Sequence, residues 1–164
     1  MTQDDLNKIL ELQKKWLNGD PDGKRADLRG SYLSGCYLSR SDLSGSDLSG
    51  CVGLISPIQY MDENFDKSPD GYIAYKTFNS EFEAPKKWNI SPGAVIEETV
   101  NATRTNTCGC GINVAPLDWV KQKYKTDNIW KVLIRWEWLP GVCVPYNTDG
   151  KIRCERVQLL EIVE

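Results

Sequence analysis

Four cysteines in the second half of the chain are the residues best suited to metal chemistry. Four thiolates can hold Zn²⁺ in a tetrahedral site. The usual zinc knuckle places two residues between its cysteines, whereas only Gly109 separates the first pair here, and the other two cysteines are isolated. We therefore expect ordinary thiols, no bound metal and no cofactor. The alternative is a zinc site made by Cys108, Cys110, Cys143 and Cys154.

A glycine-rich segment beside the first cysteine pair could bind an anion. Gly109 and Gly111 follow the polar run Thr105–Thr107 and precede a helix expected at residues 116–125. Backbone amides in a loop before a helix N-terminus can hold a phosphate. The glycine spacing matches neither the P-loop nor the dinucleotide-binding pattern, so a turn that requires glycine is the alternative.

Two tryptophans lie beside polar loops. Trp88 and Trp119, together with Arg104, Lys151 and Arg153, could line a pocket that stacks a nucleotide base and pairs its phosphate. The same residues could instead form a protein-binding hot spot, and the sequence leaves both hypotheses open. The predicted ligand- or partner-binding residues are Trp88, Arg104, Asn106, Cys108, Gly109, Cys110, Gly111, Asn113, Trp119, Lys151 and Arg153.

The chain has no histidine, which argues against catalysis. This absence removes the commonest general base, the Ser–His and Cys–His pairs and every Cys/His zinc pattern. Carboxylates are available at Glu97, Glu98, Glu137 and Asp149, but no catalytic pattern links them. We predict a protein that is not an enzyme and has no catalytic residues; an enzyme that works without histidine is the least favoured hypothesis.

The 164 residues suit one domain or two very small ones. The chain is 40% hydrophobic and 26% charged, with a net charge of -3 and a pI of about 5.1. This acidic balance predicts no direct binding to nucleic acid or to anionic membranes. No apolar run approaches the roughly 20 residues of a membrane span, and the N-terminal residues show no signal-peptide core. We expect a cytoplasmic protein with reduced thiols.

A helix is predicted at residues 3–18. Thr2 can cap it, with Asp5 three residues later, and Asn18 and Gly19 can end it. Helical spacing gives it one apolar face, made of Leu6, Ile9, Leu10, Gln13, Trp16 and Leu17. So short an amphipathic helix needs a surface to cover. The repeat that follows has an open end that such a cap would shield.

Residues 26–50 repeat with a period of five, which fits neither a helix nor a simple strand. Each pentad can form one side of a square coil and turn a corner before the next. The predicted interior positions are Leu28, Leu33, Leu38, Leu43 and Leu48, and the small residues Ala26, Ser31, Cys36, Ser41 and Ser46 two places before them. A sixth unit begins at Cys51 but has Gly53 where the leucine should stand.

These units resemble the motif of the pentapeptide-repeat family, which is close to A-(D/N)-L-x-x. The resemblance implies a right-handed quadrilateral β-helix with four pentads in each coil, so this repeat would form about one and a half coils. Some long members of the family are rods with the size and charge of duplex DNA that bind DNA gyrase. This repeat is too short for such a rod. We expect a platform or assembly face, whose open end would allow a homodimer by stacking.

The remaining residues predict an α+β domain with a mostly antiparallel sheet. Strands are expected at residues 71–78, 94–100, 130–138, 142–146, 151–157 and 159–163. Asn147–Gly150 would be the turn of a hairpin, and Trp136 and Trp138 would face the core. The predicted class is mainly β or α+β, with a capping helix and turn at 1–24, the repeat at 25–55, a linker at 56–70 and a C-terminal domain at 71–164.

Two segments of the C-terminal part, CGCGINVAPLDWV and PYNTDGKIRCERVQLLEI, resemble an uncharacterised domain found behind pentapeptide repeats in phage proteins. Some related sequences have His where this chain has Asn113. The resemblance brings no established activity. It leads us to predict a phage-encoded binding protein that engages and inhibits a host protein, either a defence component or a DNA-processing protein, in the host cytoplasm. The alternative is a protein that binds or sequesters a nucleotide-type ligand.

Overall fold

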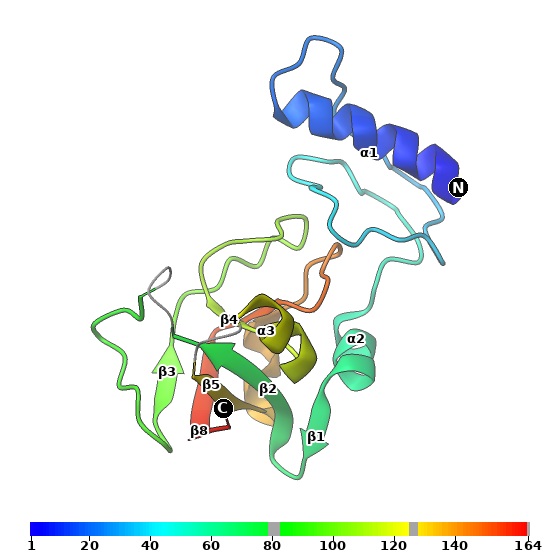
Figure 1. Cartoon of the computed structure of the whole chain (residues 1–164). Helices are drawn as coiled ribbons and strands as arrows, with labels where there is room; N and C mark the ends of the chain where they lie inside the picture. Colours follow the sequence, from blue (N-terminus) through cyan, green and yellow to red (C-terminus); the bar gives the residue numbers. More distant parts are fainter. Residues whose placement is uncertain (79–82, 125–127, 164) are drawn as a thin grey trace. The chain divides into compact units, whose positions relative to one another are not determined.

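The computed structural model describes residues 1–78, 83–124 and 128–163, which fall into two compact units (Figure 1). Unit 1 consists of Met1–Ser56 with the short segments Thr103–Cys108 and Pro145–Asp149. Unit 2 consists of Pro57–Ala102, Gly109–Val144 and Gly150–Glu164. Two short segments of the predicted C-terminal domain therefore cluster with the N-terminal repeat.

Unit 1 begins with helix α1, Gln3–Leu17, where the sequence predicts a helix. The Thr2 hydroxyl oxygen accepts a hydrogen bond from the Asp5 amide at 3.2 Å, so Thr2 is the N-cap. Acidic residues lie in the first turn and lysines in the last, which complements the helix dipole. In the described part of the chain, no helix is both long and apolar enough to cross a membrane.

Residues 26–55, the pentad coil, wind so that the second round runs beside the first. Parallel bridges join Asp27 to Asp47 and Tyr32 to Val52. Each bridge spans 20 residues, which is the length of four pentads. Residues 46–55 therefore lie alongside residues 26–35, although residues 1–78 as a whole contain no closed solenoid.

Each corner of the pentad coil is a tight turn. The Ser31 amide donates to the Leu28 carbonyl at 3.0 Å, and the same bond recurs one pentad later at Cys36 and Leu33. The residue before each such amide has a positive φ, as in a type II turn, and these residues are Gly30, Gly35, Arg40, Gly45 and Gly50. Glycine recurs at the fifth place of the pentad because it adopts this backbone conformation without strain.

The other places of the pentad also have physical reasons. Leu28, Leu33, Leu38 and Leu43 form the buried core of unit 1, with Leu48 half-buried beside them. Ala26 is buried, and the other small residues, Ser31, Cys36, Ser41 and Ser46, are half-buried. Aspartate at the second place accepts a hydrogen bond from the amide two residues later, at Asp27, Asp42 and Asp47.

Helix α1 covers one edge of the coil with two glutamines. The fully buried Gln13 donates from Nε2 to the Ser44 carbonyl at 2.8 Å and accepts from the Ala26 amide at 2.7 Å. Gln3 accepts from the Tyr37 amide at 2.7 Å and donates to the Tyr37 carbonyl at 3.3 Å. Each side-chain amide thus supplies the donor and acceptor that a neighbouring strand would supply.

The opposite edge of the third and fourth pentads is covered by the two returning segments of unit 1. The Arg40 amide donates to the Asn147 carbonyl at 3.0 Å, just as the Gly30 amide donates to the Ser49 carbonyl at 2.8 Å in the coil itself. Asn147 Nδ2 donates to the Ser41 carbonyl. Segment 145–149 therefore stands where a further pentad of the second round would stand.

The described residues of unit 2 form two antiparallel sheets. The larger sheet has the strand order β1-β2-β5-β8-β3, and β2, β5 and β8 lie side by side in Figure 1. Its strands are β1 Asp66–Ser68, β2 Gly71–Thr77, β3 Val95–Glu97, β5 Ile129–Arg135 and β8 Arg156–Ile162. The smaller sheet has the order β4-β7-β6, with β4 Ile112–Val114, β7 Ile152–Cys154 and β6 Val142–Cys143. The mostly antiparallel α+β prediction is confirmed at this level.

Within the described part of unit 2, two α-helices accompany these sheets, and both differ from the predictions. Helix α2, Pro57–Asn64, and strand β1 lie in residues 56–70, which the sequence predicts as a linker. Helix α3, Leu117–Lys123, is shorter than the predicted 116–125, with Pro116 as its N-cap. Lys125 lies outside the described residues.

The predicted strand 130–138 is wrong at its C-terminal end. Strand β5 ends at Arg135, and residues Trp136–Gly141 form a 3-10 helix, η1. Trp136 is 39% exposed, and its side chain donates from Nε1 to the Pro69 carbonyl at 2.8 Å, so it does not face the core. Pro140 lacks the amide that a continuing ladder needs, which favours the helical turn.

Replacing Gln13 with alanine tests the capping role of α1. Gln13→Ala leaves the Ala26 amide and the Ser44 carbonyl without their partners, so we expect the free energy of unfolding to fall by about 2–4 kcal/mol. Urea denaturation measures this loss. Glu11→Ala, at an exposed position of the same helix, is the control and should change it by less than about 0.5 kcal/mol. Equal effects of the two substitutions would contradict the cap.

Arg40 is the one described non-glycine residue with a positive φ, at 64°. Its side chain is 79% exposed, and its Nε lies 3.4 Å from Asp149 Oδ2. Arg40→Gly and Arg40→Ala both remove this ion pair, but only glycine relieves the backbone strain. We expect the glycine variant to be more stable than the alanine variant by about 1 kcal/mol, measured by thermal unfolding. A more stable alanine variant would show that the corner is not strained.

Candidate functional site

The second place of each pentad points outward and carries the distinctive side chains of unit 1. Asp27 and Asp47 form one pair of bridged neighbours, and Tyr32 and Val52 form the next pair. Tyr37 follows on the third pentad. The exposed fractions are 61% for Tyr32, 79% for Tyr37 and 56% for Val52. We call Tyr32, Tyr37 and Val52 the tyrosine face, and Asp27 with Asp47 the acidic column.

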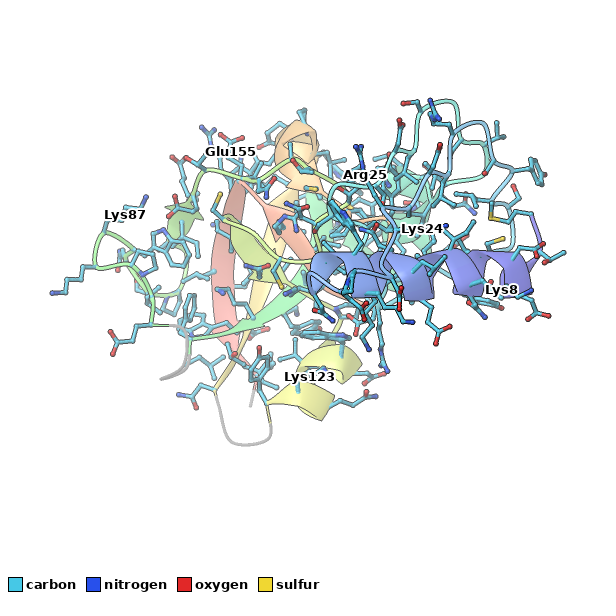
Figure 2. The ribbon with its side chains drawn as sticks, turned by 90° about the horizontal axis from the view of Figure 1, so that it is seen from above. Lys8, Lys24, Arg25, Lys87, Lys123 and Glu155 are labelled. Carbon is cyan, nitrogen blue, oxygen red and sulfur yellow. The ribbon has the colours of Figure 1, made fainter. Side chains whose placement is uncertain are left out.

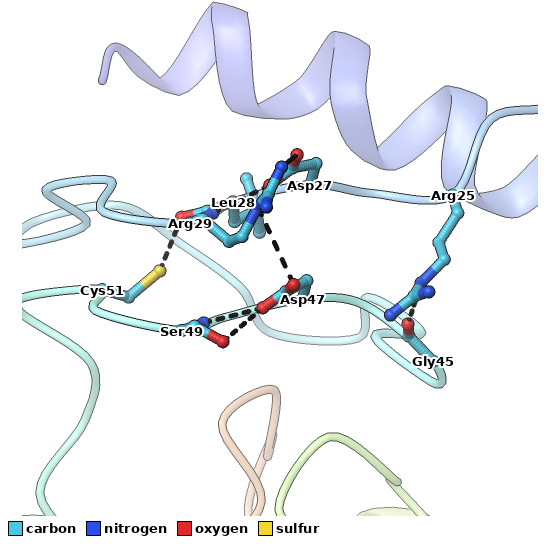
Figure 3. Close-up of polar contacts among 8 residues, drawn as sticks. All are labelled: Arg25, Asp27, Leu28, Arg29, Gly45, Asp47, Ser49 and Cys51. Atoms are coloured by element: carbon cyan, nitrogen blue, oxygen red, sulfur yellow. Dashed lines mark hydrogen bonds and ion pairs between the residues drawn. The ribbon is translucent and has the colours of Figure 1, made fainter.

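The acidic column is organised by Arg29 (Figure 3). Its Nε lies 2.8 Å from one Asp27 oxygen and its Nη2 lies 2.6 Å from the other, so the pair is bidentate. Arg29 Nε also lies 3.8 Å from Asp47 Oδ2. The hydrogen bond from Arg29 lowers the pKa of Asp27 to about 2, and the hydrogen bond from the Ser49 hydroxyl lowers the pKa of Asp47. Both carboxylates are therefore ionised near neutral pH.

The backbone under the tyrosine face is held in place. Gln3 binds both the amide and the carbonyl of Tyr37, and the N-terminal amine donates to the Tyr32 carbonyl at 3.3 Å. Within the coil, Cys51 Sγ donates to the Leu28 carbonyl, as Figure 3 shows, and burial raises the pKa of this thiol. The exposed rings thus extend from a rigid support and not from a loose loop.

Three of the predicted binding residues lie in unit 1. The Arg104 guanidinium donates to the Ile55 carbonyl at 2.6 Å and stacks 4.0 Å from the centre of the Tyr146 ring. Asn106 Oδ1 accepts from the Ser44 hydroxyl at 3.3 Å. Cys108 is exposed. The contacts of Arg104 and Asn106 attach the returning segments to the coil, which is a structural role.

Another group of predicted residues meets in the smaller sheet of unit 2. Asn113 of β4 lies opposite Arg153 of β7, and Gly111 packs against the Arg153 side chain. Arg153 is fully buried, with Nε donating to the Asn101 carbonyl at 3.0 Å and Nη2 to Cys143 Sγ at 3.1 Å. Its guanidinium is therefore not presented at the surface, where a phosphate would arrive.

The two predicted binding tryptophans belong to different packing clusters of unit 2. Trp88 donates from Nε1 to the Glu97 carbonyl at 2.8 Å and meets the Phe78 ring edge-on. Trp119 packs with the cluster around Val120 and directly against Gly150. The neighbouring Lys151 is half-buried. The basic side chains Lys87 and Lys123 extend from unit 2 in Figure 2.

The cysteines of the zinc alternative are in different surroundings. Cys108 and Cys110 are exposed, whereas Cys143 and Cys154 are buried. Cys143 lies opposite Arg153 and Cys154 opposite Val142, so the two buried side chains point to opposite faces of the sheet. Burial raises the pKa of Cys154. Over residues 1–78, 83–124 and 128–163, no three His, Cys, Asp or Glu side chains are grouped as a metal site would require.

Sequence reasoning missed two features. The tyrosine face has a visible signal, since tyrosine replaces the usual aspartate at the second place of two consecutive pentads. Lys76 of β2 has no such signal. Its Nζ lies 3.4 Å from the Asn113 carbonyl and 5.1 Å from the centre of the Phe78 ring. Burial lowers the pKa of Lys76 to about 8, and among the described residues no carboxylate forms an ion pair with it.

The lowered pKa of Lys76 makes stability depend on pH. The unfolded chain binds more protons than the folded chain between pH 8 and the ordinary lysine value of 10.5, so this group makes the free energy of unfolding rise with pH in that window. Lys76→Met should abolish that contribution, and Lys86→Met, at an exposed position, should not. Urea denaturation across the window measures both. An unchanged slope for Lys76→Met would contradict the lowered pKa.

Comparison with known proteins agrees with the repeat. The family model described as Pentapeptide repeats (8 copies) matches residues 24–52. No curated protein and no solved structure matches the chain. The segment that carries the tyrosine face and the acidic column is thus a pentapeptide repeat.

Proposed function

We propose that this chain is a non-enzymatic binding protein that engages a protein partner through its tyrosine face. The observation that carries the proposal is the exposure of Tyr32, Tyr37 and Val52 on neighbouring sides of the pentad coil. Aromatic side chains are enriched in protein interfaces and dominate their hot spots. A ring on a rigid support loses little conformational entropy when a partner covers it.

The acidic column gives this surface a charged rim. Asp27 and Asp47 lie on the side of the coil before Tyr32 and Val52, and both are ionised near neutral pH. An apolar centre bordered by charge is the usual composition of a non-obligate interface. The negative rim favours a partner with basic side chains beside its contact patch.

Two further observations support a binding role over catalysis. Pentapeptide-repeat proteins are in general structural or binding proteins, and the chain has no histidine. We infer that the pentad coil forms about one and a half coils of a right-handed quadrilateral β-helix, with the length of four pentads per round as its support. Such a coil is a short platform and not a rod that imitates DNA.

The resemblance to phage proteins extends this proposal to the biological role. We infer a phage-encoded inhibitor of a host defence component or DNA-processing protein, acting in the host cytoplasm. The nucleotide-binding alternative draws less support, because the Arg153 guanidinium that it needs is buried. A homodimer formed by stacking of coil ends is the competing prediction for the same open end of the coil.

A paired comparison tests the tyrosine face. The double variant Tyr32→Ser with Tyr37→Ser removes the two aromatic side chains but none of the hydrogen bonds that their backbones make. We expect it to recover a partner protein from a bacterial lysate at least about tenfold less well than the unmodified chain. Quantitative pull-down with native mass spectrometry measures the recovery.

Ile58→Ser is the matched control, because Ile58 is another large exposed apolar residue, on α2 of unit 2. It should leave recovery unchanged, and circular dichroism should show that all variants keep their fold. Equal recovery by the double variant would contradict the tyrosine face as the binding surface. Recovery of no protein above background by the unmodified chain would contradict the protein-binding function itself.

A further inference from the structure

The second round of the pentad coil carries backbone amides and carbonyls at the places where the first round uses such groups to bind its neighbour. In the first round, the Leu28 and Gly30 amides donate to the Asp47 and Ser49 carbonyls at 2.9 and 2.8 Å. The Ala26 carbonyl accepts from the Asp47 amide at 3.1 Å. Since the bridges relate residues 20 apart, Leu48, Gly50 and Ser46 carry the equivalent groups of the second round.

The next pentad repeats this arrangement. The Leu33 amide donates to the Val52 carbonyl at 2.7 Å, and the Ser31 carbonyl accepts from the Val52 amide at 3.0 Å. Their equivalents 20 residues later are the Gly53 amide and the Cys51 carbonyl. Within the described ranges, the amides of residues 48, 50 and 53 and the carbonyls of residues 46 and 51 have no hydrogen-bond partner. We call residues 46–53 the open edge.

Elsewhere in the same coil, the backbone groups at an edge are hydrogen-bonded to residues from outside the repeat. On the third pentad, Arg40 holds the place that Gly30 holds on the first, and its amide donates to Asn147. Asn147 comes from a segment that is not a pentapeptide repeat. On the opposite edge, the Gln3 side chain binds the Tyr37 backbone. The backbone edges of the coil can therefore bind segments that are not pentapeptide repeats.

The open edge lacks two features that often protect an exposed strand. Residues 46–53 contain no lysine and no proline, which are the residues that most often block edge pairing. Ser49, Gly50, Val52 and Gly53 are exposed. Two of these are glycines, Gly50 and Gly53, so at these two positions no side chain hinders the approach of another backbone.

We propose that the open edge binds an extended segment of the partner protein, which adds to the coil as a further strand and places a basic side chain beside Asp47. The proposal rests on the protein-binding function and names the form in which the partner is recognised. The added strand would extend the acidic column, where a third carboxylate is repelled and a lysine or arginine is attracted. Beside Val52, which is bridged to Tyr32, the added strand would place an apolar residue.

A synthetic peptide tests this inference on the full chain. The probe has the sequence of residues 46–55 with Asp47→Lys and Cys51→Ser, and the control peptide carries Cys51→Ser alone. NMR hydrogen exchange follows the Leu48, Gly50 and Gly53 amides. We expect saturating probe to slow their exchange at least about tenfold and to leave the Leu28 and Gly30 amides unchanged, because these are already paired. The control peptide should bind about tenfold more weakly.

A variant of the protein tests whether the charge of Asp47 causes the preference for the lysine peptide. Asp47→Asn keeps the side-chain oxygen that binds the Ser49 amide but removes the charge, so the two peptides should bind within about twofold of each other. Unchanged exchange of the three amides with the lysine probe would overturn the inference. So would protection that grows with protein concentration in the free chain, since a second copy would then occupy the edge. Either result leaves the tyrosine-face experiment to judge the proposed function separately.

Discussion

The structure of unit 1 depends on one constraint, which is that a very short coil must satisfy the backbone hydrogen bonds at its edges. In a long solenoid almost every side has a neighbour above and below, so only the ends need caps. Among the residues that the structure describes, only the pairs bridged at Asp27–Asp47 and Tyr32–Val52 have a coil neighbour, and each of these has one on one edge only. Caps are therefore as important as the repeat itself.

This constraint explains features of the chain that are distant in sequence. Gln13 lies inside an otherwise apolar helix face because the coil edge needs one donor and one acceptor there. The segments Thr103–Cys108 and Pro145–Asp149 cluster with the coil. In the second of them, Asn147 supplies the backbone acceptor that a further pentad would offer to the Arg40 amide. The strained corner at Arg40 occurs where the coil meets this segment, and the Asp149 carboxylate accompanies it.

The parts of the fold that follow from local pattern could be predicted. The period of five gives the leucine core and the corners, and capping residues give α1, because each depends on neighbours within a few residues. The docking of segment 145–149 could not be predicted, since its partner Arg40 is more than 100 residues away and an Asn-Thr-Asp-Gly run is equally typical of a plain hairpin turn. The end of β5 depended on Pro140 and on contacts with Pro69, which periodicity does not report.

The signal of the candidate site is a departure from the sequence pattern that builds the coil. Aspartate at the second place of a pentad accepts a hydrogen bond from the amide two residues later, so it stabilises the side on which it lies. Tyr32 and Tyr37 give up that bond and expose large rings instead. A local rule broken twice in succession, without a packing gain inside the coil, is most simply explained by a surface kept for another molecule. The same reasoning separates these tyrosines from Arg153, whose burial and hydrogen bonds already account for its presence.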